Sequence, residues 1–123
     1  MYIGPGVIFT NDLHPRAVNE DGFTKTESDW TKYAVVVKSG ASIGAGAICV
    51  APVTIGKWSM IAAGSVVVKD VFNFALVAGT PAKQIGWVGK SGEKLIKEGE
   101  ETYSCPKTRK NFKLVNPESL SEL

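Results

Sequence analysis

Apolar residues recur at every sixth position through the middle of the chain, at Val37, Ile43, Cys49, Ile55, Ile61 and Val67. Small or β-branched residues stand four positions after each of these anchors, at Ala41, Ala47, Val53, Ser59, Ser65 and Val71. Residues two apart on a strand share a face, so each short strand directs one small and one aliphatic side chain inward. A period of six scatters the anchors around an α-helix but aligns them on the flat sides of a three-sided prism. The pattern therefore predicts a parallel β-helix with three hexads in each coil.

Glycine marks the corners of the predicted prism. Gly40, Gly46 and Gly64 stand three residues after an anchor, where a tight turn requires a positive φ that glycine adopts without strain. Gly44 and Gly56 directly follow an anchor. The same spacing thus accounts for both the inward-facing side chains and the turns between the flat sides.

The repeat is interrupted once. Residues 3–7 make a hexad and Phe9 begins another, after which the pattern disappears until Thr31 and Val35 restore it. Most of the local polar and charged groups lie in this interval, so we expect residues 11–32 to leave the prism as a long inserted loop. Long ordered loops on repeat scaffolds are more often functional than decorative.

The whole chain is predicted to be all-β, with a β-helix of three or so coils over residues 1–88 and a C-terminal extension over residues 89–123. The first coil begins at Ile3 and presents unpaired strand edges, which native proteins normally cover. Two explanations compete: contacts in an oligomer cover this end, or a fuller version of the chain has upstream coils. We favour the second.

The extension is expected to contain little regular structure. Residues 94–97 are predicted to form a turn of helix, and Tyr103 is predicted to pair with residues 112–114 as two short strands. From Asn116 onward the chain is expected to fray.

Composition and charge exclude several classes of function. The 123 residues carry a net charge of +2 spread along the sequence, which predicts neither nucleic-acid nor membrane binding. The N-terminus is a structural hexad instead of a secretory signal, and no apolar tract is long enough to cross a membrane. Cys49 occupies an inward anchor and Cys105 lies in a polar tail, so no disulfide is expected and the chain is predicted to be cytoplasmic. Cys105 and Pro106 resemble half a zinc knuckle, but the other ligands are missing and no metal is predicted.

Three stretches together resemble a known family: residues 3–16, the Asp29-Trp30 pair and residues 78–87. They are similar to the left-handed β-helix acyltransferases, and within these to the bacterial N-acetyltransferases that act on nucleotide-linked 3-amino sugars. The hexads and Ala-Gly-Thr-Pro-Ala-Lys are shared with the whole superfamily, whereas Phe-Thr-Asn-Asp and Ile-Gly-Trp are narrower. The resemblance implies a left-handed β-helix, an acetyl-CoA donor, a nucleotide-sugar acceptor and an acetamido sugar product for surface polysaccharide. It also implies a homotrimer with active sites in the grooves between neighbouring prisms.

The resemblance also places the donor on particular residues. Matching the motifs position by position puts Ala45 and Ala63 against the pantetheine arm, and Val68, Lys69 and Lys83 near the adenosine and the phosphates. A lysine ammonium is a suitable point-charge partner for phosphate. In a purely structural interpretation, Lys69 and Asp70 form only a solvated ion pair at a corner.

Amide formation needs an unprotonated amine, a polarised thioester and a route for the departing proton. Asn11 and Asp12 open the insertion, so Asn11 is a candidate to hold the thioester or sugar and Asp12 to anchor the attacking amine. His14 is a candidate base because imidazole titrates near neutral pH, and Arg16 is a candidate partner for a carboxylate or phosphate of the substrate. The subfamily resemblance implies that no side-chain base is required, and that an aromatic residue often replaces His14. Alternatively, Asn11 and Asp12 only cap the turn that begins the loop.

Other functions remain open from the residues alone. An O-acetyltransferase acting on a sugar, serine or antibiotic would depend on His14 as a catalytic base. A zinc hydratase of the carbonic anhydrase type shares the prism but needs three histidine ligands, whereas this chain has one histidine. A trimer that lacks upstream coils, binds CoA and is inactive is the non-enzymatic alternative.

Overall fold

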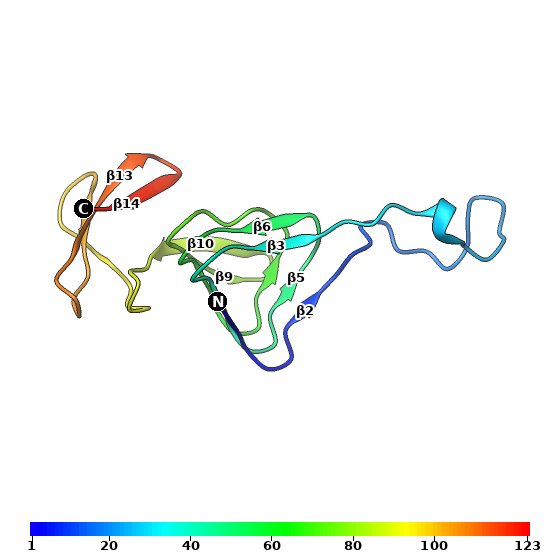
Figure 1. Ribbon diagram of the computed structural model, residues 1–123, viewed down its shortest axis with the longest axis horizontal. Helices are drawn as coiled ribbons and strands as arrows, with labels where there is room; N and C mark the ends of the chain where they lie inside the picture. Colours follow the sequence, from blue (N-terminus) through cyan, green and yellow to red (C-terminus); the bar gives the residue numbers. More distant parts are fainter.

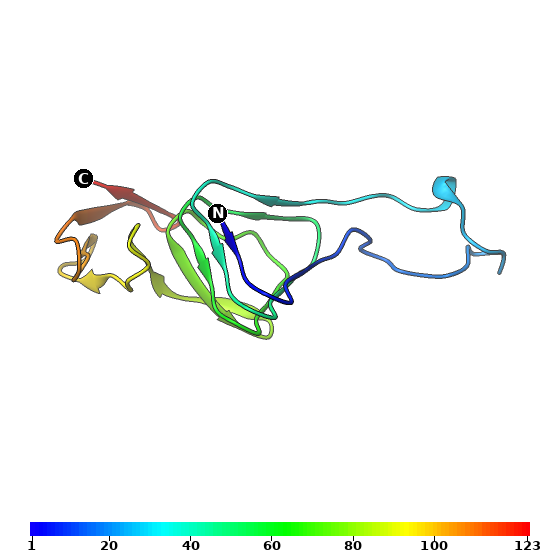
Figure 2. The same cartoon turned by 60° about the horizontal axis from the view of Figure 1, so that its bottom comes forward.

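The computed structural model describes residues 1–123, and its strands confirm the predicted all-β class. The only helical element is the 3₁₀ turn η1 (Glu27–Asp29). Figures 1 and 2 show a central prism, a long inserted segment extending from one side and a smaller sheet on the other. None of the helical structure has the length and apolar character needed to span a bilayer.

Three sheets form the sides of the prism. The first side contains β1 (Tyr2–Ile3), β4 (Ser42–Ile43), β7 (Met60–Ile61) and β9 (Ala75–Gly79). The second contains β2 (Ile8–Phe9), β5 (Ile48–Cys49) and β8 (Val66–Val67), and the third contains β3 (Val35–Val37) and β6 (Val53–Ile55). All these strands pair in parallel, with Ser42 opposite Met60 and Ile48 opposite Val66. Because partners lie 18 positions apart, the prediction of three hexads in each coil is confirmed.

The predicted inward residues make the core of the prism. The anchors Ile43, Cys49, Ile55, Ile61 and Val67 are all at most 1% exposed. The small residues between them are buried too, and the hydroxyls of Ser59 and Ser65 satisfy their hydrogen-bonding needs by donating to Gly56 O and Ala62 O, each at 2.7 Å. The first coil, with β1 and β2, is called here the upper end of the prism, and the last coil is called the lower end. The core is open at the upper end, where Ile3 is 43% and Phe9 41% exposed.

Corner glycines adopt the backbone conformation that their spacing predicts. Gly40, Gly46 and Gly64 have φ of 76°, 71° and 73°. Gly44 is needed for a different reason, because a Cβ atom at this position would lie 2.5 Å from the backbone nitrogen of Ala63 in the next coil. Successive coils therefore stack with their backbones in close contact at this corner.

The segment between β2 and β3, residues 10–34, is called here the inserted segment. Ile3 pairs with Ile43, 40 positions away, so this coil is 22 residues longer than the regular period of 18. The backbone N–H of Tyr33 donates to Asn11 O at 2.9 Å and closes its base. Beyond that base the inserted segment extends away from the prism and is held by local turns (Figure 2).

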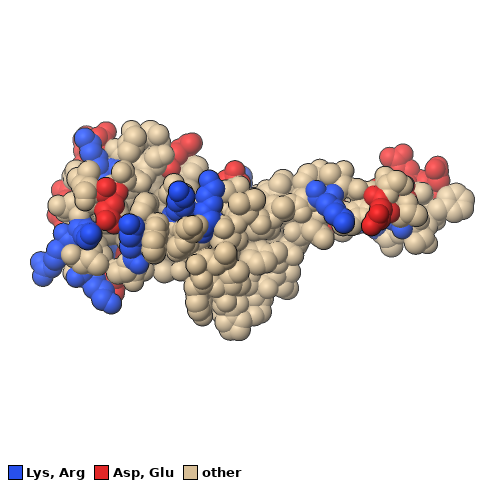
Figure 3. Space-filling view, in the orientation of Figure 1, with Lys and Arg blue, Asp and Glu red and all other residues tan.

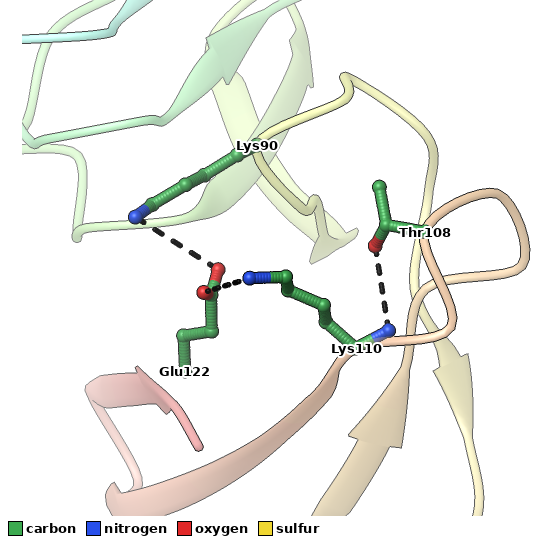
Figure 4. Close-up of polar contacts among 4 residues, drawn as sticks. All are labelled: Lys90, Thr108, Lys110 and Glu122. Carbon is green, nitrogen blue, oxygen red and sulfur yellow. Dashed lines mark hydrogen bonds and ion pairs between the residues drawn. The ribbon is translucent and has the colours of Figure 1, made fainter.

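The last strand of the first side turns back in an antiparallel hairpin, β9 with β10 (Ala82–Trp87). A four-stranded antiparallel sheet follows, formed by β11 (Ile96–Lys97), β12 (Thr102–Ser104), β13 (Asn111–Asn116) and β14 (Ser119–Glu122). Phe112 of this sheet meets Phe74 of the prism edge to face, with ring centroids 5.5 Å apart. Glu122 pairs with Lys90 at 3.9 Å and Lys110 at 3.5 Å (Figure 4), and such partly exposed pairs contribute about 0–1 kcal/mol each.

The C-terminal expectations were partly wrong. The predicted pairing of Tyr103 with Phe112 is confirmed, but Ile96–Lys97 is a strand instead of a turn of helix. The end of the chain does not fray, because Leu120 of β14 is buried in the core. The side chain of Asn116 accepts a hydrogen bond from Glu118 N at 2.9 Å, which supports the turn that brings β14 back onto β13.

Candidate functional site

Two alanines expected to meet the pantetheine arm occupy equivalent corners of successive coils. Ala45 and Ala63 are both exposed, and Gly64 N donates to Ala45 O at 2.9 Å. Gly46 N donates to Pro5 O at 2.9 Å in the coil above. The structure therefore brings Pro5, Ala45 and Ala63 into one column where no long side chain hinders approach to the backbone.

A cavity of about 440 Å³ lies at the lower end of the prism and is called here the lower cavity. It brings together Val68 and Lys69, which follow β8, and Lys83 of β10. Ala45 and Ala63 are not among its lining residues. The complete lining is Val67, Val68, Lys69, Asp70, Val71, Phe72, Val77, Pro81, Ala82, Lys83 and Gln84.

The charges of the lower cavity are unbalanced. Both salt bridges of the protein involve Glu122, so Lys69 and Lys83 have no carboxylate partner and the suggested ion pair between Lys69 and Asp70 is absent. Oδ1 of Asp70 accepts a hydrogen bond from Thr54 N at 2.7 Å, which directs it toward the neighbouring coil. Two free ammonium groups therefore flank a mostly apolar cavity.

Asn11 and Asp12 stand at the base of the inserted segment. Oδ1 of Asp12 accepts a hydrogen bond from His14 N at 3.1 Å. One oxygen of this carboxylate therefore caps the turn, as the structural interpretation of Asp12 predicts. Its second oxygen and the side-chain amide of Asn11 make no hydrogen bond within the chain and remain available to a ligand.

His14 and Arg16 line a second cavity, of about 800 Å³, within the inserted segment. The remaining lining is Val18, Asn19, Glu20, Asp21, Lys25, Ser28 and Asp29. A hydrogen bond from Thr26 N, at 2.9 Å, is the main reason why the pKa of Asp29 is lowered. His14 and Arg16 thus face a site with several carboxylates, and Asn11 and Asp12 are not part of it.

Within one chain the predicted site residues form three separate groups: the alanine column, the lower cavity and the inserted segment. Figure 3 shows that charged side chains gather on the inserted segment and the C-terminal sheet, while the prism between them is nearly uncharged on this face. Sequence reasoning missed Phe72 and Gln84, which line the lower cavity beside the predicted lysines. Phe72 directly follows Val71 at the end of the regular repeat, and this position was the only signal in the sequence.

The two cysteines are free and buried, so Cys105 does not lie in a polar tail as expected. Burial raises the pKa of the Cys49 thiol. Burial would also raise the pKa of Cys105, but hydrogen bonds outweigh it and lower the pKa to about 7. Their donors include the Ser91 hydroxyl at 3.3 Å and Thr108 N at 3.4 Å. The chain has no cluster of three or more histidine, cysteine, aspartate or glutamate side chains suited to a metal ion.

No protein-family model matches the chain. The dTDP-3-amino-3,6-dideoxy-alpha-D-galactopyranose 3-N-acetyltransferase of Aneurinibacillus thermoaerophilus is 47% identical over 60 residues, which are 49% of this chain and 31% of that protein. The 2,3,4,5-tetrahydropyridine-2,6-dicarboxylate N-acetyltransferase of Clostridium perfringens (strain 13 / Type A) is 49% identical over 85 residues, which are 69% of this chain and 30% of that protein. The homologues of this chain are hexapeptide-repeat acyltransferases. The chain spans about a third of the length of these two curated relatives.

A solved structure extends the likeness to the fold. The hexapeptide-repeat-containing acetyltransferase from Vibrio cholerae O1 biovar eltor, complexed with acetyl coenzyme A, aligns with a TM-score of 0.56 and 26% identity. The alignment covers 72% of this chain and 47% of that chain. The hexapeptide period in the sequence and the stacked coils in the structure thus agree with the kind of protein to which the chain is similar.

Proposed function

We propose that this chain belongs to an acetyl-CoA-dependent N-acetyltransferase that acetylates the 3-amino group of a nucleotide-linked amino sugar. The observations that carry the proposal are the lower cavity, where Lys69 and Lys83 stand without carboxylate partners, and the separate column of exposed alanines. This arrangement suits a long donor with phosphates at one end and an uncharged arm. The relative that acts on a dTDP-linked 3-amino sugar supports the choice of acceptor.

In this proposal the donor lies on the prism and the acceptor at the base of the inserted segment. The pantetheine arm follows Ala45 and Ala63, and the phosphates contact Lys69 and Lys83 beside Val68. The acceptor amine attacks the thioester carbonyl carbon, so that the C–N bond forms, the C–S bond breaks and CoA departs as the thiol.

The inserted segment supplies the polar groups of the proposed reaction. The amide of Asn11 donates to the thioester or the sugar, and the free oxygen of Asp12 orients the attacking amine. Arg16 holds an anionic group of the acceptor, and His14 is the candidate to accept the proton from the amine.

The separation of the three groups within one chain supports a site completed by neighbouring subunits. We infer a homotrimer in which grooves between prisms hold the donor, and a left-handed β-helix of three or so coils over residues 1–88. As functional bounds we propose residues 11–32 for the loop within the inserted segment and residues 89–123 for the extension. We place the reaction in the cytoplasm, without a metal ion.

Acetyl transfer can be tested by following free thiol. Acetyl-CoA is mixed with the protein and either a dTDP-linked or a UDP-linked 3-amino sugar, and the matching 3-hydroxy sugar nucleotide serves as the control acceptor. We expect thiol release with an amino acceptor, its loss in Asp12→Ala, and little release with the hydroxy sugar. Absence of release with both amino sugars at high protein concentration would contradict the proposal.

A second candidate is an O-acetyltransferase, because serine acetyltransferases also occur among the homologues. In that case His14 would act as the base that activates a hydroxyl. Turnover of serine or a sugar hydroxyl, abolished in His14→Ala, would favour this candidate over the amino-sugar enzyme.

A further inference from the structure

The inserted segment leaves the prism at Thr10, directly after β2. Strands β2, β5 and β8 lie opposite one another in register, so Thr10 corresponds to Val50 and Val68, the residues that follow β5 and β8. Threonine has nearly the shape of valine but carries a hydroxyl group in place of one methyl group. Packing alone therefore gives no reason for a threonine at this position.

The hydroxyl of Thr10 binds the coil below. Its Oγ1 accepts a hydrogen bond from the backbone N–H of Ala51 at 2.9 Å, across 41 positions of the sequence. Ala51 is fully buried, and no backbone carbonyl accepts from its N–H. Because a buried N–H without an acceptor is costly, this hydrogen bond holds Thr10 firmly at the corner of the prism.

Backbone hydrogen bonds fix the chain on both sides of this corner. Thr10 N donates to Cys49 O at 3.0 Å, and Tyr33 N donates to Asn11 O at 2.9 Å. The side-chain amide of Asn11 and one oxygen of Asp12 have no partner in the chain, so they follow wherever this backbone places them. The two hydrogen bonds of Thr10 therefore tie the first polar groups of the inserted segment to the prism.

We propose that Thr10 is a positioning residue for the acceptor, because its hydroxyl fixes the corner from which Asn11 and Asp12 meet that molecule. The inference rests on the proposed function, in which Asn11 donates to the thioester or the sugar and Asp12 orients the attacking amine. Thr10 touches neither reactant and acts through these two neighbours. Small errors in the placement of reacting groups cost large factors in rate, so loss of the hydroxyl should slow the transfer even in a folded protein.

The kinetic test compares Thr10→Val, which removes the hydroxyl, with Thr10→Ser, which keeps it. With acetyl-CoA and a dTDP-linked or UDP-linked 3-amino sugar, Thr10→Val should lower kcat about tenfold and leave the KM for acetyl-CoA unchanged. Thr10→Ser should retain the wild-type kcat. Thr31→Val is the matched control, because Thr31 is exposed in the inserted segment and its hydroxyl makes no hydrogen bond within the chain. Thr10→Ala gives the same comparison if the valine variant does not fold.

Binding measurements separate positioning from a purely structural role and do not depend on turnover. In calorimetric titrations with the same two sugar nucleotides, Thr10→Val alone should weaken binding about fivefold. In a background that carries Asn11→Ala and Asp12→Ala, it should have no further effect, since Thr10 acts through these residues. Hydrogen exchange of the Ala51 amide should be faster in Thr10→Val and should keep the wild-type rate in Thr10→Ser.

Each outcome supports or overturns the inference. Unchanged kcat and sugar affinity in Thr10→Val, despite faster exchange of the Ala51 amide, would overturn it. An equal loss of sugar affinity in both backgrounds would also overturn it, because Thr10 would then act on the fold as a whole. If the wild type releases no thiol but the binding pattern is as expected, the proposed function fails and the positioning role of Thr10 stands. If the wild type binds neither sugar nucleotide, both fail.

Discussion

The prism and the inserted segment are held together by different interactions. In the prism, side chains repeated every 18 residues stack in a dry core, and Ile43 and Ile55 are fully buried. The inserted segment has no buried residue and is shaped by short-range hydrogen bonds, such as those to the side chains of Asn19 and Asp29. The comparison indicates that the prism carries most of the stability of the protein, while substitutions in the inserted segment should leave the core intact.

A substituted aspartate should give the largest difference in the free energy of unfolding between the prism and the inserted segment. Ile43→Asp should lower the free energy of unfolding by about 4–5 kcal/mol, because an unpaired carboxylate would enter the core. Leu13→Asp, at a side chain that is 40% exposed on the inserted segment, should change it by no more than about 0.5 kcal/mol. Urea denaturation measures both variants. Equal losses would mean that the inserted segment also contributes to the core.

Glycine substitutions should give the next largest difference. Gly44→Ala should cost about 2–3 kcal/mol, because its Cβ would collide with the backbone of the adjacent coil at Ala63. Gly22→Ala in the inserted segment meets no atom within 4 Å and should cost about 1 kcal/mol, for its positive φ of 84° alone. Thermal melts of the two variants provide the measurement. A larger loss for Gly22→Ala would contradict the close stacking of coils.

Substitutions in the prism and in the inserted segment should also differ in their effect on CoA affinity. Ala63→Glu adds bulk and negative charge to the alanine column, so CoA binding should fall at least about tenfold with an unchanged melting temperature. Asp12→Ala should leave CoA affinity unaltered, because Asp12 is proposed to orient the acceptor amine and to contact no part of CoA. Calorimetric titration with CoA checks both. Equal affinity of wild type and Ala63→Glu would show that the donor does not follow this column.

The smallest effect concerns pH and one turn of the inserted segment. The folded-state pKa of Asp29 is lowered, mainly by the hydrogen bond from Thr26 N, so the stabilised turn is present above the ordinary carboxyl pKa of 3.8. Its stabilisation is lost as pH falls through the lowered value. An NMR titration should therefore show the Thr26 amide signal moving below pH 3.8, and Asp29→Asn should abolish this movement. An unchanged titration in the variant would assign the effect to another group.

Repetition explains why the prism could be predicted while other parts could not. Ile43, Ile61 and the corner glycines recur at a fixed period that can be recognised in a single sequence. Each further repeat supports the same prediction of a coil. β14 carries no such repetition, and its burial depends on Leu120 meeting residues far away in the sequence. The same limit applies to the site: Lys69 and Lys83 were found through a motif, whereas Phe72 and Gln84 became visible only when the chain brought β10 beside the corner after β8.

The edge-to-face contact between Phe74 and Phe112 joins the C-terminal sheet to the prism within one apolar cluster. Heating cannot expose one of these rings without exposing the other, so the two parts should melt in a single calorimetric peak. Proteases, in contrast, should cut the inserted segment well below that temperature, and the nicked protein should still melt as one unit.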